Sequence, residues 1–152
     1  MSVPIRIFVD ADACPVKEET YKVARRYGLQ THVVSNGFMM VPREPLIEQV
    51  VVDAGPDVAD DWIAERAGPA DIVITSDIPL ASRCLKAGAQ VLNPRGVPFT
   101  HDSIGSALAR REIAEHLRSF GAMTSGPKPF GTKDRSAFLQ ALDQAVNRAK
   151  RR

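Results

Sequence analysis

The sequence predicts a single α/β domain built on a mainly parallel sheet of about five strands. Short apolar runs alternate with stretches of helical periodicity along residues 1–92. Strands separated by helices are typical of right-handed βαβ crossovers, which build parallel sheets. The chain has 152 residues, enough for one ordinary domain, and it contains no internal repeat and no linker-like boundary. We therefore expect residues 1–152 to form one domain.

The first strand is expected over residues 5–9 (IRIFV), a short apolar run. A helix is expected over residues 15–27, because a proline stands at its first position, glutamates lie in its first turn and a glycine follows its last residue. The second strand, residues 31–35 (THVVS), ends at a turn made by Asn36 and Gly37.

The same alternation continues through the next five elements. Residues 47–52 are expected to be the third strand, after a stretch in which two prolines exclude a regular element. Residues 57–67 then form a helix, and residues 71–75 (DIVIT) form the fourth strand. Residues 78–87 are a helix with a proline in its first turn, and residues 90–92 are a brief fifth strand.

The last third of the chain has a different composition. A helix is expected over residues 103–119, with Asp102 or Ser103 as its cap. Residues 119–133 are rich in glycine and proline and are expected to be a flexible loop. Apolar residues at helical spacing then predict a C-terminal helix over residues 134–152, which ends in a basic tail.

Aspartates follow the first and fourth predicted strands. Asp10 and Asp12 come directly after the first strand, and Asp77 comes after the fourth. Ligands bind outside the carboxyl ends of the strands in open parallel sheets, at the point where the strand order reverses. The first and fourth strands are commonly neighbours there, so we expect Asp10 and Asp77 to face each other. Helix capping is the competing role, open to Asp12 or the Cys14 backbone for the first helix and to Asp77 for its own.

A third acidic group lies at the start of the second predicted helix. Asp57, Asp60 and Asp61 fall at i, i+3 and i+4, so they project near one helical face. Asp57 is expected to cap the helix, and the helix dipole favours acids in the first turn. Asp60 and Asp61 add a mutual repulsion that the dipole barely offsets. A cation is therefore their natural partner.

Carboxylate clusters of this kind favour Mg²⁺ or Mn²⁺. The expected metal ligands are Asp10, Asp60, Asp61 and Asp77. The three histidines do not have zinc-site spacing, and no phosphate loop of the G-x-x-x-x-G-K type is present. A pair of carboxylate-held ions, about 4 Å apart, activates a water on one side of a phosphodiester and stabilises the leaving oxygen on the other. The sequence therefore predicts phosphodiester hydrolysis.

The order of these motifs resembles the PIN-like nuclease superfamily, with D-A-D at residues 10–12 and T-S-D at residues 75–77. More closely, VDADACPVK, GPDVADDWIA, VITSDIPLA, LNPRG and GPKPFGTKDRSAFLQALD are similar to the bacterial YaiI/YqxD family. This resemblance covers nearly the whole chain. It implies a three-layer α/β/α PIN-like domain with C-terminal helices. The similarity to PIN-like nucleases, together with the carboxylate cluster, predicts a Mg²⁺- or Mn²⁺-dependent nuclease acting on RNA or single-stranded nucleic acid, with the catalytic residues Asp10, Asp12, Asp61 and Asp77.

One departure from the PIN-like pattern leaves alternatives open. Many PIN nucleases add a glutamate on a helix after the second strand, where this chain has a loop rich in methionine and proline, with Glu44 and Glu48 as substitutes. A site with one ion, or a PIN-like module that binds nucleic acid or a partner without cutting it, is therefore an alternative. A further alternative is a phosphatase of the DxD type, but such enzymes need an acid pair after the T-S-D motif, whereas Asp60 and Asp61 precede it.

The charge of the chain is divided between its two parts. Residues 1–100 carry ten basic and thirteen acidic residues, a charge of −3, whereas residues 101–152 carry ten basic and five acidic residues, a charge of +5. A site that gathers cations and faces a polyanion would show this division. The candidate substrate-binding residues are Lys17, Ser76, Arg95, Lys128, Lys133 and Arg135. Phe130 is expected either to stack on a base or to pack against the core.

The remaining features concern the compartment of the protein. Cys14 and Cys84 make no disulfide framework and lack the C-x-x-C spacing of a redox or zinc site. The N-terminal residues MSVPIRIF lack the apolar stretch of a secretory signal, and no apolar run reaches membrane-spanning length. We expect a cytoplasmic protein with two free thiols and no membrane partner, whose oligomeric state the sequence leaves open.

Overall fold

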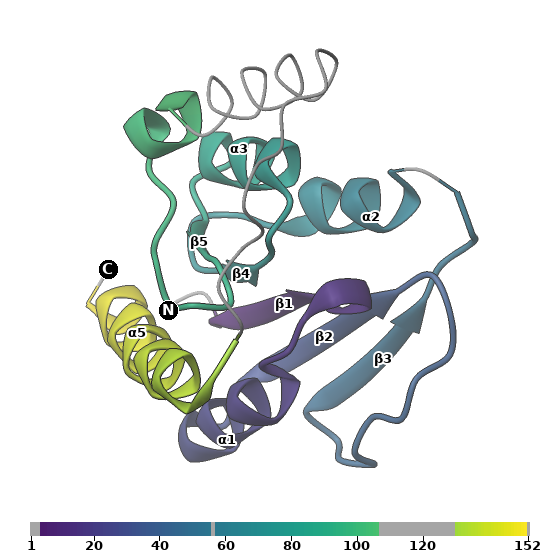
Figure 1. Ribbon diagram of the computed structural model, residues 1–152. Helices are drawn as coiled ribbons and strands as arrows, with labels where there is room; N and C mark the ends of the chain where they lie inside the picture. The colour runs from purple at the N-terminus through teal and green to yellow at the C-terminus, as the bar shows by residue number, and fades with distance from the viewer. Residues whose placement is uncertain (1–3, 56, 107–129, 152) are drawn as a thin grey trace.

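The computed structural model describes residues 4–55, 57–106 and 130–151. Its centre is a sheet of five parallel strands in the order β3-β2-β1-β4-β5 (Figure 1). The strands are β1 (Arg6–Asp10), β2 (Gln30–Ser35), β3 (Ile47–Val51), β4 (Ile72–Ile74) and β5 (Gln90–Leu92). The predicted parallel α/β architecture is confirmed, and each strand end lies within one residue of its predicted place. β1 and β4 are neighbours, as expected.

Helices cover both faces of the sheet (Figure 1). They are α1 (Lys17–Tyr27), α2 (Val58–Arg66), α3 (Ile78–Lys86) and α5 (Thr132–Lys150). Helices α1 and α5 lie on one face of the sheet, and α2 and α3 lie on the other. The predicted three-layer α/β/α arrangement is therefore confirmed. No helix in the described parts of the chain is long and apolar enough to span a membrane.

Alternation along β1 produces the two cores. Ile7 and Val9 point towards α1 and α5, where they pack with residues such as Leu142. Phe8 points the other way, into a second cluster that includes Ile63 of α2 and Leu80 of α3. Successive side chains of a strand point to opposite faces, so a strand buried on both faces has to be apolar throughout. This is why the buried middle of β1, residues 7–9, is apolar without interruption.

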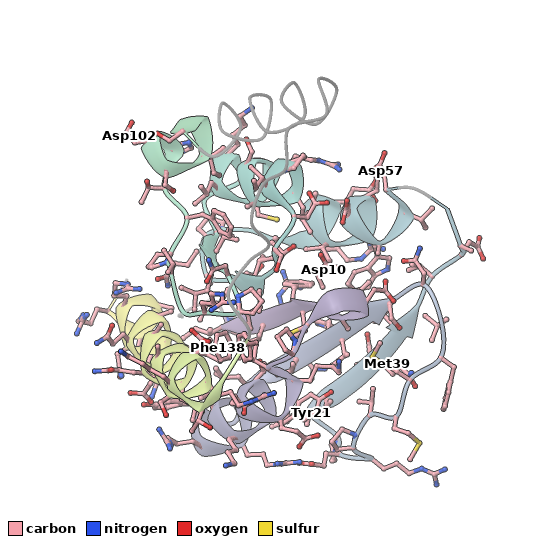
Figure 2. The ribbon with its side chains drawn as sticks, viewed as in Figure 1. Asp10, Tyr21, Met39, Asp57, Asp102 and Phe138 are labelled. Atoms are coloured by element: carbon pink, nitrogen blue, oxygen red, sulfur yellow. The ribbon has the colours of Figure 1, made fainter. Side chains whose placement is uncertain are left out.

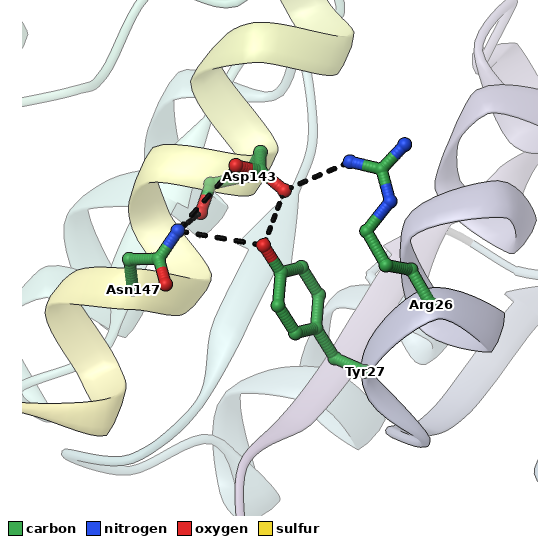
Figure 3. Close-up of polar contacts among 4 residues, drawn as sticks. All are labelled: Arg26, Tyr27, Asp143 and Asn147. Atoms are coloured by element: carbon green, nitrogen blue, oxygen red, sulfur yellow. Dashed lines mark hydrogen bonds and ion pairs between the residues drawn. The ribbon is translucent and has the colours of Figure 1, made fainter.

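Polar contacts fasten α5 to α1, although the two helices are far apart in sequence (Figure 3). The Tyr27 hydroxyl donates to Oδ1 of Asp143 at 2.6 Å, and Arg26 donates to the same oxygen at 3.0 Å. Asn147 donates to the carbonyl oxygen of Asp143 at 3.0 Å. The C-terminal helix, predicted from residue 134, begins two residues earlier and is an integral layer of the domain.

Two further helix starts also lie two residues from their predicted places. Pro15 does not open α1, which begins at Lys17 with Val16 at the N-cap, because residues 15 and 16 form a turn. The helix expected from residue 103 begins at residue 101. Its cap is Thr100 rather than Asp102 or Ser103, since the Thr100 and Ser103 side chains each accept a bond from the other residue's backbone N–H. The rest of the helix predicted over residues 103–119 and most of the predicted loop fall on residues 107–129, which lie outside the described part of the chain.

Candidate functional site

The carboxyl ends of β1 and β4 meet at the point where the strand order reverses. Val9 pairs with Ile74, so the next residues along each strand, Asp10 and Thr75, lie side by side. The Thr75 hydroxyl donates to Oδ2 of Asp10 at 2.7 Å and accepts from the backbone N–H of Asp77 at 2.9 Å. A single buried hydroxyl therefore connects the ends of two strands that are far apart in sequence.

A cavity of about 500 Å³ opens at this edge of the sheet. Asp10, at the end of β1, and Asp57, at the start of α2, both line it; Figure 2 labels the two residues. Five aspartates line the cavity in all: Asp10, Asp12, Asp57, Asp60 and Asp77. The cavity thus collects carboxylates from the end of β1, the start of α2 and the turn after β4, which are the three places where the sequence predicts ligands.

The aspartates destabilise one another as anions. The pKa of Asp60 is raised to about 6, mainly by burial and then by the negative charges of Asp77 and Asp10. The pKa of Asp10 is also raised, first by burial, against which the Thr75 hydrogen bond acts, and then by the charges of Asp77 and Asp12. Repulsion of this kind is relieved either by protons or by a cation.

Three of the five aspartates accept hydrogen bonds from groups that lie next to them in space. Asp77 is the N-cap of α3, and its side chain accepts from the backbone N–H of Leu80 at 2.8 Å. Asp12 accepts from the backbone N–H of Asn36 at 3.0 Å, and Asp10 accepts from Thr75. The capping role weighed for Asp77 is therefore present, but that of Asp12 is not, since the N-cap of α1 is Val16 without a side-chain bond.

Asp57 stands at the N-cap of α2, as expected, but its side chain makes no capping bond. Its φ of 70° lies in the left-handed region that residues other than glycine rarely adopt. Such backbone strain is often found at functional sites. Asp57 also lines the cavity, so its side chain is available to the candidate site and is not used to cap the helix.

Asp61 does not line the cavity. Its side chain, 54% exposed, forms an ion pair of 2.7 Å with Arg83 of α3. Consecutive helical residues point about 100° apart, so α2 cannot turn both Asp60 and Asp61 towards one point. Burial of Ala59 and Ile63 sets the rotation of α2 and directs Asp60, not Asp61, to the cavity. Of the two aspartates of α2 that were predicted as metal ligands, Asp60 therefore lines the cavity and Asp61 does not.

The residue types fit a hard divalent cation, but their present positions do not close a ligand shell. Carboxylate oxygens are the ligands that Mg²⁺ and Mn²⁺ prefer. Among the described residues, no group of three or more His, Cys, Asp and Glu side chains is arranged to hold a metal ion. Mg²⁺ is often held by only one or two carboxylates, together with waters and substrate phosphates. The donor set fits that open kind of site.

The predicted substrate-binding residues divide into two groups. Ser76 lines the cavity and also a second hollow beside it, which Arg95 lines as well. Lys17 donates to the carbonyl oxygen of Cys14 at 2.9 Å, and Arg135 donates to that of Pro15 at 2.6 Å. Lys133 is exposed on α5 and lines neither space. Lys128 lies outside the described ranges.

For two residues, the sequence does not predict a place in the site. Thr75 is part of the T-S-D motif, and Asn36 is part of the turn after the second predicted strand. Asn36 follows β2, the strand next to β1, so its place at the carboxyl edge of the sheet was a signal that could have identified it. Cys14 also lines the cavity, but burial raises the pKa of its thiol, which argues against thiolate chemistry.

Comparison with known proteins gives a consistent set of relatives. The family model described as "Uncharacterized BCR, YaiI/YqxD family" matches residues 8–148. A UPF0178 protein of Caulobacter sp. (strain K31) is 68% identical over 145 residues, covering 95% of this chain and 96% of the relative. UPF0178 proteins of Caulobacter vibrioides (strain NA1000 / CB15N), 66% identical over 95% of both chains, and Nitrobacter winogradskyi, 60% identical over 97% of this chain and 94% of the relative, are also similar. No solved structure matches the chain.

Proposed function

The chain belongs to the YaiI/YqxD family, and we propose that its aspartate-lined cavity is the active site of a divalent-metal-dependent nuclease. The proposed reaction is hydrolysis of phosphodiester bonds in RNA or single-stranded nucleic acid, with Mg²⁺ or Mn²⁺ as cofactor. The observation that supports it is the convergence of five aspartates on one cavity at the switch point of a parallel sheet. Such a cluster suits chemistry on an anionic substrate only when cations neutralise it.

In this proposal Asp10, Asp60 and Asp77 are the carboxylates from which the metal would take one or two ligands, and water and phosphate would supply the others. When bound, it would activate water and stabilise the charge that develops on the phosphodiester oxygens. Thr75 orients Asp10 through its 2.7 Å hydrogen bond, and Asn36 holds Asp12 at the rim. Asp77 would offer its carboxylate to the cation while it keeps the bond that it accepts from the backbone N–H of Leu80.

The PIN-like relationship is part of the same proposal. The three-layer fold and the placement of acids after β1, on α2 and after β4 support it. The two cysteines are free and buried, which is compatible with the reducing cytoplasm, where we place the activity.

Metal binding is the first test. Mn²⁺ at about 100 times its Kd should stabilise the wild type by about 2.7 kcal/mol, which raises Tm by several degrees. Asp10→Asn and Asp60→Asn should lose this shift, and Asp60→Asn should raise the metal-free Tm because it removes a repelling charge. Asp61→Asn is the matched control, since it removes the same charge from the same helix outside the cavity. Asp61→Asn should keep the metal-induced shift.

Cleavage is the second test. A panel of RNA and DNA oligonucleotides, single- and double-stranded, is incubated with each divalent metal and each variant. Asp10→Asn and Asp60→Asn should lose at least about a hundredfold in rate, whereas Asp61→Asn should stay near the wild type. Cleavage by the Asp10→Asn/Asp60→Asn double variant would refute the proposal that the aspartate-lined cavity is the active site. Metal binding without any cleavage would favour the non-catalytic binding module instead.

A further inference from the structure

We propose that the second hollow, beside the aspartate cavity, holds a nucleobase of the substrate strand. The inference rests on the proposed function and deepens it, because it defines the substrate. A base that enters a hollow cannot be paired at the same time. The substrate would therefore be a strand that is unpaired next to the phosphate in the aspartate cavity.

The second hollow has a volume of about 360 Å³ and lies beside the aspartate cavity, with which it shares three lining residues. Ser76, Ile78 and Pro94 line both spaces, so they form the wall between them. The two spaces are adjacent along one edge of the sheet, as a phosphate and the base attached to its neighbouring sugar are adjacent along a strand.

The lining of the hollow fits a flat, mostly apolar group with a polar edge. Phe99, Phe130 and Pro94 provide apolar surface, and Arg95 and Asn93 provide polar groups. Unpaired bases are typically bound by stacking on aromatic rings or on the guanidinium plane of arginine, with hydrogen bonds at their edges. A free phosphate would find few donors on this lining, whereas a base would find both kinds of contact.

The Arg95 guanidinium is held in place before any ligand arrives. It forms an ion pair of 3.0 Å with Asp134 and lies over the Phe130 ring, 5.5 Å from its centroid. Asp134 is fixed in turn, because it accepts from the backbone N–H of Gly131 at 3.0 Å. Since the ion pair offsets the charge of Arg95, its planar face is better suited to stacking on a base than to clamping a phosphate.

The loop that carries Arg95 is also fixed. Oδ1 of Asn93 accepts from the backbone N–H groups of Arg95, at 2.9 Å, and Val97, at 3.0 Å. Gly96 has a φ of +85°, and a Cβ there would lie 2.7 Å from the carbonyl oxygen of Ala137. Only glycine allows the loop to approach α5 this closely. A preorganised wall loses little entropy when a ligand binds, which favours the binding of a single base.

Nucleosides test the inference without the nuclease reaction. The full chain, labelled with ¹⁵N and free of metal, is titrated with adenosine, with uridine and with ribose as the base-free control, and amide shifts are followed by NMR. The uncharged probes avoid repulsion by the aspartates. The amides of Arg95, Gly96, Phe99 and Phe130 should shift with the nucleosides, and ribose should bind at least about tenfold more weakly. Equal shifts with ribose, or nucleoside shifts confined to other parts of the chain, would overturn the inference.

Two variants sharpen the result. Arg95→Lys keeps the charge but loses the plane, and Phe130→Leu keeps an apolar side chain but loses the ring; each should weaken nucleoside binding about tenfold. Phe38→Leu is the matched control, since Phe38 is 79% exposed and lines neither space, and it should bind as the wild type does. Unchanged binding in both test variants would contradict the role of the hollow. Nucleoside binding without cleavage in any metal would uphold the hollow and refute only the nuclease.

Discussion

Thr75 joins the two strand ends that form the candidate site. Its side chain is buried, and its hydroxyl contacts both Asp10 and the backbone of Asp77. Groups that orient metal ligands in this way often affect metal affinity nearly as much as the ligands themselves. The role of Thr75 can therefore be separated from that of the aspartates by experiment.

Thr75→Val should weaken Mn²⁺ binding about tenfold, because Asp10 loses the bond that orients it. Isothermal titration calorimetry measures the change. The matched control is Thr20→Val, since Thr20 is equally buried and donates its hydroxyl to the carbonyl oxygen of Val16 at 2.9 Å without lining the cavity. Both variants should lose about 1 kcal/mol of stability, but only Thr75→Val should lose metal affinity. Equal metal affinity in the two variants would refute the orienting role.

Helix α5 completes the layer that covers one face of the sheet. Phe138, Leu142, Ala145 and Val146 are fully buried in the cluster that also contains Ile7 and Val9 of β1. The polar contacts of α5 with α1 add direction to this apolar packing (Figure 3). Because residues 93–97 dock on α5 at Ala137, the helix also supports the wall of the second hollow.

Substitution of two tyrosines of α1, one at a time, tests the contact between α1 and α5. Tyr27→Phe should lower the free energy of unfolding by about 1–2 kcal/mol, because the Asp143 carboxylate loses a hydrogen-bond donor at 2.6 Å. Tyr21→Phe, one and a half turns earlier on α1, is the control, since the buried Tyr21 hydroxyl has no hydrogen-bond partner among the described residues. Its removal should be neutral or stabilising. Urea unfolding measures both, and equal losses would contradict the specific role of Tyr27.

The molecule as a whole has a pH dependence that follows from its acidic cavity. The pKa of Asp60 is about 6 in the folded protein, against 3.8 for an unperturbed aspartate. Between these two values the folded state binds more protons than the unfolded state, so stability falls as pH rises. Glu44, Asp134 and Asp143 have lowered pKa values, so the stability that they contribute is lost only as pH falls below about 4.

Metal-free wild type should therefore become less stable between pH 4 and pH 6. Asp60→Asn should flatten this part of the profile, since the asparagine does not titrate, and saturating Mn²⁺ should abolish it in the wild type because the cation replaces the protons. Urea midpoints at a series of pH values measure the effect. If the wild-type profile runs parallel to that of Asp60→Asn, the pKa of Asp60 is not raised by burial and by the other carboxylates.

Much of the fold could be predicted because it depends on local patterns. The apolar runs identified all five strands, and the turn residues placed their ends. The start of α1 was mispredicted, because a proline fits a turn before a helix as well as the first position within it. The choice between Asp60 and Asp61 was also beyond the sequence, because adjacent residues share every local property and differ only in direction.

The sequence by itself determined which side chains are available and at which strand ends they stand. Asp10 and Asp77 follow apolar strands whatever the packing, and parallel strands bring their carboxyl ends to one edge. Only the tertiary structure decided that α2 turns Asp60 inwards and pairs Asp61 with Arg83. It alone also brought residues 93–96 against α5 and formed the second hollow. The reason is physical: a strand's direction follows from its own residues, whereas the rotation of a helix and the docking of a loop follow from burial against distant parts of the chain.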